Sequence, residues 1–375
     1  MRRAFPLLFV ILLGCTSARP AANSGSATPV ASERKEPRVV DDLELRIRAD
    51  VDPVSGLDAY DAQDLFELGL ARLDSDEATL ARVLFARLVR EFPSSPLAVP
   101  ARYNLALSAE RQGRTEDAVA LFLEYVAVIE PTDPAEAAEL RLHAGTLAFD
   151  ADRWDLALLP LDRARRSGQL DHPDTWLARA MLARIRGREG AWKQAEDELE
   201  DILAEIKRRT RLHKELHPSS SALVWYHAAS LYRDQAHAQR LLDVDDLYAA
   251  RAWLDRTAAH FLEARRCYKR VLEHRNPAWS GRAAIELGAI NEDFRARMLG
   301  ADTPTELDAE GTAVYLSLLE EQTRSFLEKA VQDYRWLVMD AADLRILPED
   351  VATLREALAR VEAELEPPEG TAAAP

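Results

Sequence analysis

The stretch LFELGLARLDSDEATLARVLFARLVREFPSSP, residues 65–96, places Gly69, Ala81, Phe85 and Pro93 at fixed distances along the chain. The same spacing of small and large residues recurs three more times: Ala106, Ala118 and Phe122; Gly145, Ala157 and Leu161; Ala183, Ala195 and Leu199. Small residues let two helices cross closely, while the large residue fills the gap beside them. The pattern therefore predicts a helical hairpin that is repeated four times in tandem.

The length of this repeat follows from the alanine at the start of each second helix. It stands at positions 81, 118, 157 and 195, in steps of 37, 39 and 38 residues. The pattern resembles the tetratricopeptide repeat (TPR), in which Leu-Gly or Leu-Ala on helix A, and Ala with an aromatic on helix B, recur about every 34 residues. Leu68-Gly69 and Leu105-Ala106 fill the first slot. The resemblance implies an all-α fold, an α-α superhelix built as a TPR solenoid.

Beyond residue 205 the pattern loosens, yet Leu287-Gly288 opens a further unit with the same small-residue slot. The segment from Asp246 to His274 contains no Gly or Pro, and we expect one long helix there that projects from the array. Pro348 precedes an acidic first turn, which predicts a helix N-terminus. We therefore expect about six hairpins: four TPR units in 41–205, degenerate hairpins with long helices in 206–347, a capping helix in 348–366 and a disordered tail in 367–375.

The amino terminus has the pattern of a secretory signal. Arg2 and Arg3 precede an apolar stretch, residues 4–14, that is too short to span a bilayer. It ends in Leu12-Leu13-Gly14-Cys15, which resembles the lipobox of bacterial lipoproteins. The resemblance implies that a signal peptide, residues 1–14, is removed and that the Cys15 thiol is diacylglycerated. The alternative is an ordinary secretory signal with an incidental cysteine.

A lipidated Cys15 would anchor the chain to a membrane. One acyl chain binds a bilayer only marginally, and each buried methylene adds about 0.8 kcal/mol, so the three chains of a lipoprotein make desorption negligible. Thr16 after the cysteine resembles the default signal for the outer membrane. Residues 15–40 are rich in Ser, Ala and Pro, and they predict a flexible linker. We expect a lipid-anchored protein of the outer membrane that faces the periplasm.

Composition supports a helical protein that does not bind nucleic acid. Apolar residues make up 47% of the chain, with few glycines and abundant Ala, Leu, Glu and Arg. The formal net charge is −16, and it becomes −18 if Arg2 and Arg3 are removed with the signal. A chain this acidic is not expected to bind nucleic acid. Cys267 has no partner once Cys15 is acylated, so no disulfide is expected within the chain.

Residues that carry chemistry are scarce. His213 and His217 have the spacing of two metal ligands on one helix face, but no third ligand is identifiable, and a solvated helix end is favoured. The basic run in 207–214 either complements a helix C-terminus or binds an anionic partner or lipid headgroup. No phosphate-binding loop or hydrolase nucleophile motif is present. We expect no catalytic residue, cofactor, metal or small-molecule substrate.

Two classes of function remain. The block Phe85-x6-Phe92-Pro93-x-Ser-Pro96 resembles the TPR lipoproteins of the β-barrel assembly machinery and the periplasmic coordinators of envelope growth. The resemblance implies a non-catalytic scaffold that binds other envelope proteins, in outer-membrane assembly, secretion or motility. The alternative is a regulatory or accessory subunit of a periplasmic peptidoglycan-remodelling enzyme. In such arrays the helix A residues line the groove, which gives the candidate contacts Arg102, Asn104, Arg141, Arg179 and Tyr226.

Overall fold

The computed structural model describes residues 60–212, 218–241 and 243–365, and within these ranges the chain forms thirteen α-helices and no strand. The first eight are α1 (Ala62–Asp74), α2 (Ala78–Glu91), α3 (Ala98–Arg111), α4 (Thr115–Ile129), α5 (Pro134–Asp150), α6 (Trp154–Arg166), α7 (His172–Arg188) and α8 (Trp192–Arg211). The other five are α9 (Pro218–Ala238), α10 (Leu247–Glu273), α11 (Pro277–Leu299), α12 (Ala309–Met339) and α13 (Pro348–Leu365). The all-helical prediction is confirmed.

Local sequence explains where several helices begin. The Asp61 carboxylate accepts the backbone N–H groups of Gln63 and Asp64 at 2.9 Å, and the Asp64 carboxylate accepts the N–H of Asp61 at 3.2 Å. This reciprocal arrangement satisfies N–H groups that have no partner inside the helix. Asp133 and Asn276 cap α5 and α11, each directly before a proline in the first turn. The sequence therefore fixes these helix starts locally.

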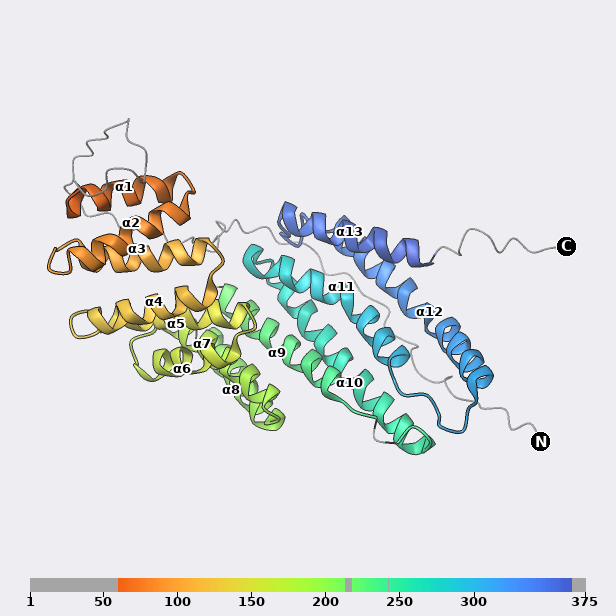
Figure 1. Ribbon diagram of the computed structural model, residues 1–375. Helices are drawn as coiled ribbons and strands as arrows, with labels where there is room; N and C mark the ends of the chain where they lie inside the picture. The colour runs from red at the N-terminus through yellow and green to blue at the C-terminus, as the bar shows by residue number, and fades with distance from the viewer. Residues whose placement is uncertain (1–59, 213–217, 242, 366–375) are drawn as a thin grey trace, which may run out of the picture.

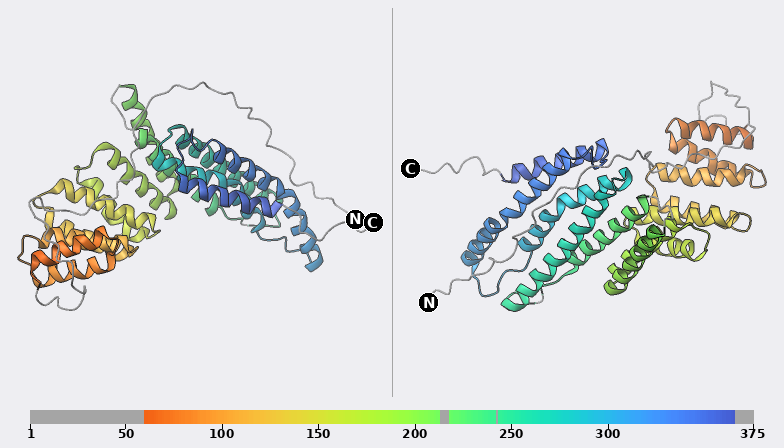
Figure 2. Two further views of the ribbon diagram at one scale, coloured as in Figure 1. Left: turned by 90° about the horizontal axis from the view of Figure 1, so that it is seen from above. Right: turned by 180° about the vertical axis from the view of Figure 1, so that it is seen from behind.

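Helices pack mainly against their neighbours in sequence, as in an α-α superhelix. The odd-numbered helices also contact one another, since α9 lies against α7 and α11, and α11 lies against α13. Figures 1 and 2 show helices α1–α8 at one end of the molecule and helices α9–α13, which include the three longest, at the other. Two apolar cores result, one drawn from α1–α7 and one from α7–α13.

The small and large residues of the repeated pattern lie against each other across each hairpin. A Cβ atom added to Gly69 would lie 2.7 Å from the ring of Phe85, and one added to Gly145 would lie 2.6 Å from Leu161. Gly288 on α11 lies in the same way against the ring of Tyr334 on α12. These distances are shorter than van der Waals contact, so only glycine fits without a shift of the neighbouring side chain or helix.

The expected projection of the helix after Asp246 is wrong. This helix, α10, lies along α9, because Trp253, Thr257 and Phe261 form a buried stripe on one of its faces. The Trp253 indole N–H also donates to the backbone carbonyl of Gln239 at 3.3 Å. Both α10 and α12 have exposed first turns, which leave Tyr248 of α10 and the side chains of residues 314, 316 and 318 of α12 in solvent.

No helix in the described part of the chain is both long enough and apolar enough to cross a membrane. The signal peptide, the lipobox, Cys15 and the linker of residues 15–40 all lie outside the described residues, as does the tail of residues 367–375. These assignments stay predictions from the sequence.

Candidate functional site

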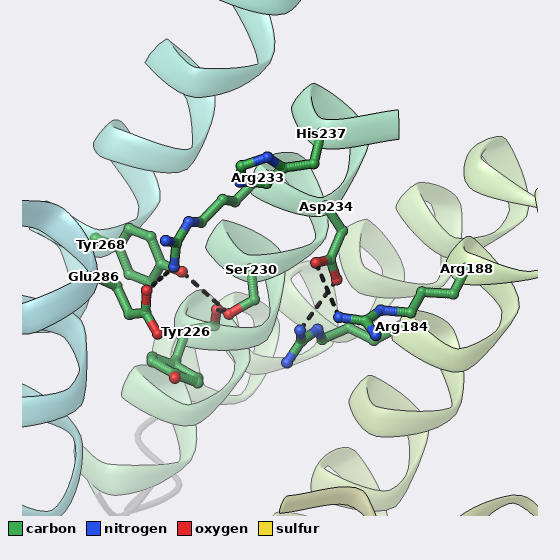
Figure 3. Close-up of a pocket in the computed structure, with 9 residues that line it drawn as sticks. All are labelled: Arg184, Arg188, Tyr226, Ser230, Arg233, Asp234, His237, Tyr268 and Glu286. Atoms are coloured by element: carbon green, nitrogen blue, oxygen red, sulfur yellow. Dashed lines mark hydrogen bonds and ion pairs between the residues drawn. The ribbon is translucent and has the colours of Figure 1, made fainter. Parts of the chain in front are cut away.

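A pocket of about 280 Å³ opens on the face formed by α7, α9 and α11 (Figure 3). We call it the α7–α9–α11 pocket. It is lined by Arg184 and Arg188 of α7, by Tyr226, Ser230, Arg233, Asp234 and His237 of α9, by Tyr268 of α10 and by Glu286 of α11. Three of these side chains are arginines and two are carboxylates, so the lining is polar and charged. Such a surface suits hydrogen bonds and ion pairs with a ligand more than apolar burial.

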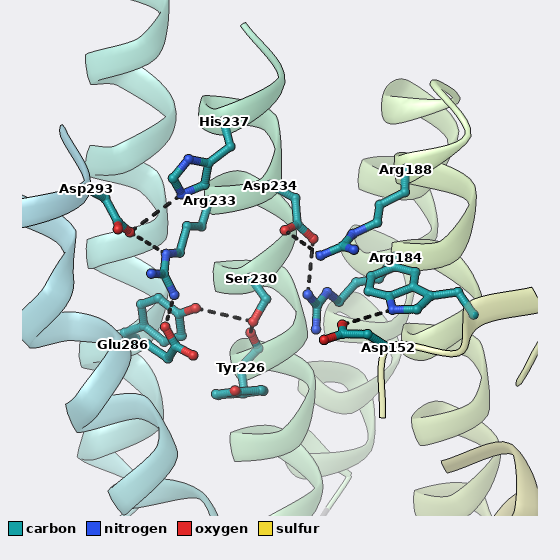
Figure 4. Close-up of polar contacts among 12 residues, drawn as sticks. Asp152, Arg184, Arg188, Tyr226, Ser230, Arg233, Asp234, His237, Glu286 and Asp293 are labelled. Atoms are coloured by element: carbon teal, nitrogen blue, oxygen red, sulfur yellow. Dashed lines mark hydrogen bonds and ion pairs between the residues drawn. The ribbon is translucent and has the colours of Figure 1, made fainter. Parts of the chain in front are cut away.

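Two arginines share one carboxylate on one side of the pocket. Arg184 donates to Asp234 at 3.1 Å and Arg188 donates to the other oxygen of Asp234 at 3.4 Å (Figure 4). Residues 184 and 188 lie on one face of α7 because they are four positions apart. Asp234 is therefore shared between two guanidinium groups on this side of the pocket.

Aromatic rings from the α5–α6 hairpin support these arginines. The Arg188 guanidinium carbon lies 3.7 Å from the centre of the Trp154 ring, and Arg184 lies 5.2 Å from that of Phe149. The two rings stack on each other with centroids 4.9 Å apart. The Trp154 indole N–H donates to Asp152 at 3.1 Å, which fixes the ring. Cation–π contacts of this kind restrict the arginine rotamers before any ligand binds.

A second charge network lies on the opposite side, between α9 and α11. Arg233 donates to Asp293 at 2.5 Å and forms an ion pair with Glu286. His237 Nε2 lies 3.6 Å from the same Asp293 carboxylate. Burial alone would raise the pKa of Asp293, but the contacts from His237 and Arg233 outweigh it and lower that pKa. Asp293 therefore stays charged and fixes Arg233 in place.

Tyrosines lie between the two networks. The Tyr268 hydroxyl is 3.2 Å from the Ser230 hydroxyl, and burial raises the pKa of Tyr268. Tyr226 packs beside Tyr268 with ring centroids 5.8 Å apart, and burial raises its pKa as well. Both phenols are therefore neutral hydrogen-bonding groups at neutral pH. The pocket offers donors, acceptors and ring surface to a bound chain.

Among the predicted groove residues, Tyr226 is the one that lines this pocket. Asn104 on α3 has none of its surface exposed and belongs to the core, so its assignment to the groove is wrong. Arg102, two residues earlier on the same helix, is half-buried and lies outside the pocket. The residue pattern predicts that this segment is helical, but it does not predict the rotation of the helix about its axis, and that rotation decides which side chains are buried.

The other two predicted groove residues, Arg141 and Arg179, form ion pairs within the protein. Arg141 is buried and donates to Glu130 at 2.5 Å, and this hydrogen bond lowers the pKa of Glu130. Arg179 donates to Glu198 of α8 at 2.6 Å and lies 3.4 Å from Glu205. Arg179 therefore faces α8, whereas Arg184 and Arg188 face α9. The five predicted groove residues do not come together in one site.

Sequence reasoning missed the residues that do come together. They occupy polar positions on successive odd-numbered helices: Arg184 and Arg188, then Arg233, Asp234 and His237, then Glu286 and Asp293. A spacing of four residues places Arg184 with Arg188, and Arg233 with His237, on one helix face, and a spacing of seven does the same for Glu286 and Asp293. Asp234, next to Arg233, faces α7 instead. Comparing the polar faces of the first helices of consecutive hairpins would have revealed them.

The remaining candidates are the histidine pair and the basic run. His213 and His217 lie outside the described residues, and within the described ranges no group of three His, Cys, Asp or Glu side chains could bind a metal. In the basic run, Arg209 donates to Glu205 at 3.2 Å, while Lys207 and Arg208 are exposed. The chain matches no known protein-family model, and comparison with curated proteins gives no match either.

Proposed function

We propose that this protein is a TPR-like lipoprotein, anchored to the outer membrane through Cys15, that acts as a non-catalytic scaffold in a cell-envelope complex. The support for a repeat array is the order of the helices, which can be grouped as six consecutive hairpins, α1–α2 to α11–α12, with α13 as a cap. The glycines that lie against large residues across three of these hairpins support it further. Arrays of this kind present extended surfaces for partners.

The observation that carries the proposal is the α7–α9–α11 pocket. All of its lining side chains except Tyr268 of α10 come from odd-numbered helices, which are the helix A positions of the proposed hairpins. These helices line the binding groove in the TPR arrays that the sequence resembles. Its arginines are already held by Asp234, Glu286 and ring contacts, so binding a ligand would cost little side-chain entropy.

An extended segment of a partner protein fits this lining. Its backbone N–H groups could donate hydrogen bonds to the hydroxyl and carboxylate oxygens of the pocket. An acidic side chain of the partner could bind Arg188, which is half-exposed and shares its counterion, Asp234, with Arg184. The expected partner is therefore another envelope protein that presents a polar, partly acidic segment.

Crosslinking and affinity capture from native membranes tests this function. Wild-type protein is compared with Arg188→Glu, and Arg186→Glu serves as a matched control on the same helix, because Arg186 lies outside the pocket. We expect Arg188→Glu to lose the partner set and Arg186→Glu to retain it. Equal capture by both variants would contradict the pocket as the binding site.

The membrane anchor needs a separate comparison. With Cys15→Ser, partners of the outer-membrane fraction should no longer be recovered. If this variant captured the same set from soluble extract, the anchor would be incidental, and the alternative of an accessory subunit of a peptidoglycan-remodelling enzyme would be favoured.

A further inference from the structure

A second groove lies on the other side of α9, between α8 and α10. Both helices pack on α9, and the groove between them has a volume of about 220 Å³. We call it the α8–α10 groove. Leu199 and Leu203 of α8 form one wall, Cys267 of α10 forms the other, and Trp225 and Tyr232 of α9 lie at its base. This lining is largely apolar, unlike that of the α7–α9–α11 pocket.

The size of the groove indicates what it can accept. Pockets that bury a drug-sized ligand have volumes of about 300–1,000 Å³, and this groove is smaller. It matches the space that one or two apolar side chains of a protein partner would fill. Buried aromatic and aliphatic anchors of that kind supply most of the binding free energy of protein interfaces.

The rim of the groove is acidic. Within the described part of the chain, neither Glu196 nor Glu200 makes an ion pair, and Glu196 is bonded only to the neutral amide of Gln235, at 2.6 Å. The one cation of the lining, Arg266, is already paired with Glu263 at 2.5 Å. Two carboxylates without a direct ion pair therefore border an apolar groove, with Lys193 the nearby cation that acts on both. That combination complements an apolar side chain flanked by positive charges.

The aromatic residues at the base add polar groups to this surface. Both side chains are partly exposed, and among the described residues neither the Trp225 indole N–H nor the Tyr232 hydroxyl has a hydrogen-bond partner. Burial and then the nearby Glu196 raise the pKa of Tyr232 to about 12, so its hydroxyl stays protonated. A partner backbone could accept both hydrogen bonds. Aromatic side chains with a free polar end are enriched at protein interfaces.

We propose that the α8–α10 groove is a second protein-binding surface, which receives an amphipathic segment whose apolar anchor is flanked by lysine or arginine. The first pocket and this groove lie on different faces of α9, so one scaffold could bind two partners together. The inference does not depend on the function proposed for the α7–α9–α11 pocket, because no side chain is shared between the two linings.

A defined probe tests the proposal. The probe is a fluorescein-labelled peptide of three Leu-Lys-Lys-Leu-Leu-Lys-Lys heptads, and a peptide with glutamate in place of lysine is the control. Fluorescence anisotropy is measured with the purified full-length protein, the charge-reversal variant Glu200→Lys and its matched control Asp201→Lys. Residues 200 and 201 are both exposed on α8, but only Glu200 lines the groove. The two variants change the net charge equally.

We expect the lysine peptide to bind and the glutamate peptide not to bind. Glu200→Lys should weaken binding by about tenfold, equivalent to 1.4 kcal/mol, and Asp201→Lys should leave it nearly unchanged. Leu203→Gln should weaken binding too, whereas Leu212→Gln, at an exposed site outside the groove, should not. Circular dichroism checks that each variant is folded.

Two results would overturn the proposal. Equal loss of affinity in Glu200→Lys and Asp201→Lys would mean that the acidic surface attracts the peptide without using the groove. Unchanged affinity in folded Leu203→Gln would mean that no apolar side chain enters it. Neither result bears on capture through Arg188, so the two proposals fail separately.

Discussion

Arg265 on α10 binds Asp333 on α12 through both of its terminal guanidinium nitrogens. Arg265 Nη2 donates to Asp333 Oδ1 at 2.6 Å, and Nη1 donates to Oδ2. Asn291 on α11 donates to the same Asp333 carboxylate at 2.8 Å. Asp333 is only 8% exposed. A single carboxylate thus joins three consecutive long helices at a point where water has little access.

The first prediction concerns this contact. Asp333→Ala leaves the Arg265 guanidinium without its partner and should lower the free energy of unfolding by about 3 kcal/mol. Glu328→Ala, at an exposed position on the same helix, should change it by less than about 0.5 kcal/mol. Urea denaturation followed by circular dichroism measures both. A loss in Asp333→Ala no larger than in the control would show that the contact adds no stability.

The second prediction concerns the close crossing within the third hairpin. Gly145→Ala places a Cβ too near Leu161, so the helices must move apart, at a cost of about 1–3 kcal/mol. Adding Leu161→Val removes part of the opposing side chain. The double variant should therefore be less destabilised than the sum of the two single variants. Additive losses would contradict direct contact between these residues.

The third prediction concerns pH. His227 is buried among Phe149, Tyr226 and Trp279, and burial lowers its pKa well below the ordinary value of 6.5. Below pH 6.5 the unfolded chain therefore binds a proton that the folded protein excludes. The contribution of His227 to the free energy of unfolding should be fully present above pH 6.5. As the pH falls below 6.5, the free energy of unfolding should decrease by up to about 1.4 kcal/mol per pH unit because of this residue.

The variant His227→Phe isolates that slope. Burial also lowers the pKa of His260 and His274, so several histidines contribute to the pH dependence of the wild-type protein. The difference in pH dependence between wild type and His227→Phe therefore gives the contribution of His227. Urea denaturation at pH 7.5 and 5.5 should show a smaller decrease in the variant. Identical decreases would mean that His227 is protonated in the folded state.

The fourth prediction concerns the thiol of Cys267. Its side chain is buried, and burial raises the pKa of this thiol to about 12. Only the thiolate reacts, so at pH 8 the native Cys15→Ser protein should react with Ellman's reagent far more slowly than the same protein in urea. Rapid reaction without denaturant would show that the groove wall at Cys267 opens readily.

The packing of the hairpins could be predicted from the sequence, because a small residue such as Gly69 is followed at the same distance in each of the first four hairpins by a large residue such as Phe85. The pocket could not. Arg184 and Asp234 lie fifty positions apart on two helices, and their contact depends on how α9 packs on α7. Asn104 shows the same limit within one helix, since its polar side chain predicts a surface position although the rotation of α3 buries it.

The extent of a helix was also easier to predict than the helices against which it packs. The absence of Gly and Pro predicted α10, but whether that helix projects depended on the buried stripe formed by Trp253, Thr257 and Phe261. That stripe is recognisable only once α9 is placed beside it.

Helix α7 contributes to both apolar cores. Met181, Leu182 and Ile185 belong to the N-terminal core, while Trp176 and Ala180 belong to the C-terminal one. A fragment that ends before residue 172 or begins after residue 188 would expose the apolar wall that α7 covers. Any attempt to express the two halves separately should therefore include α7 in each piece, and a substitution in this helix should lower the melting temperature of both halves together.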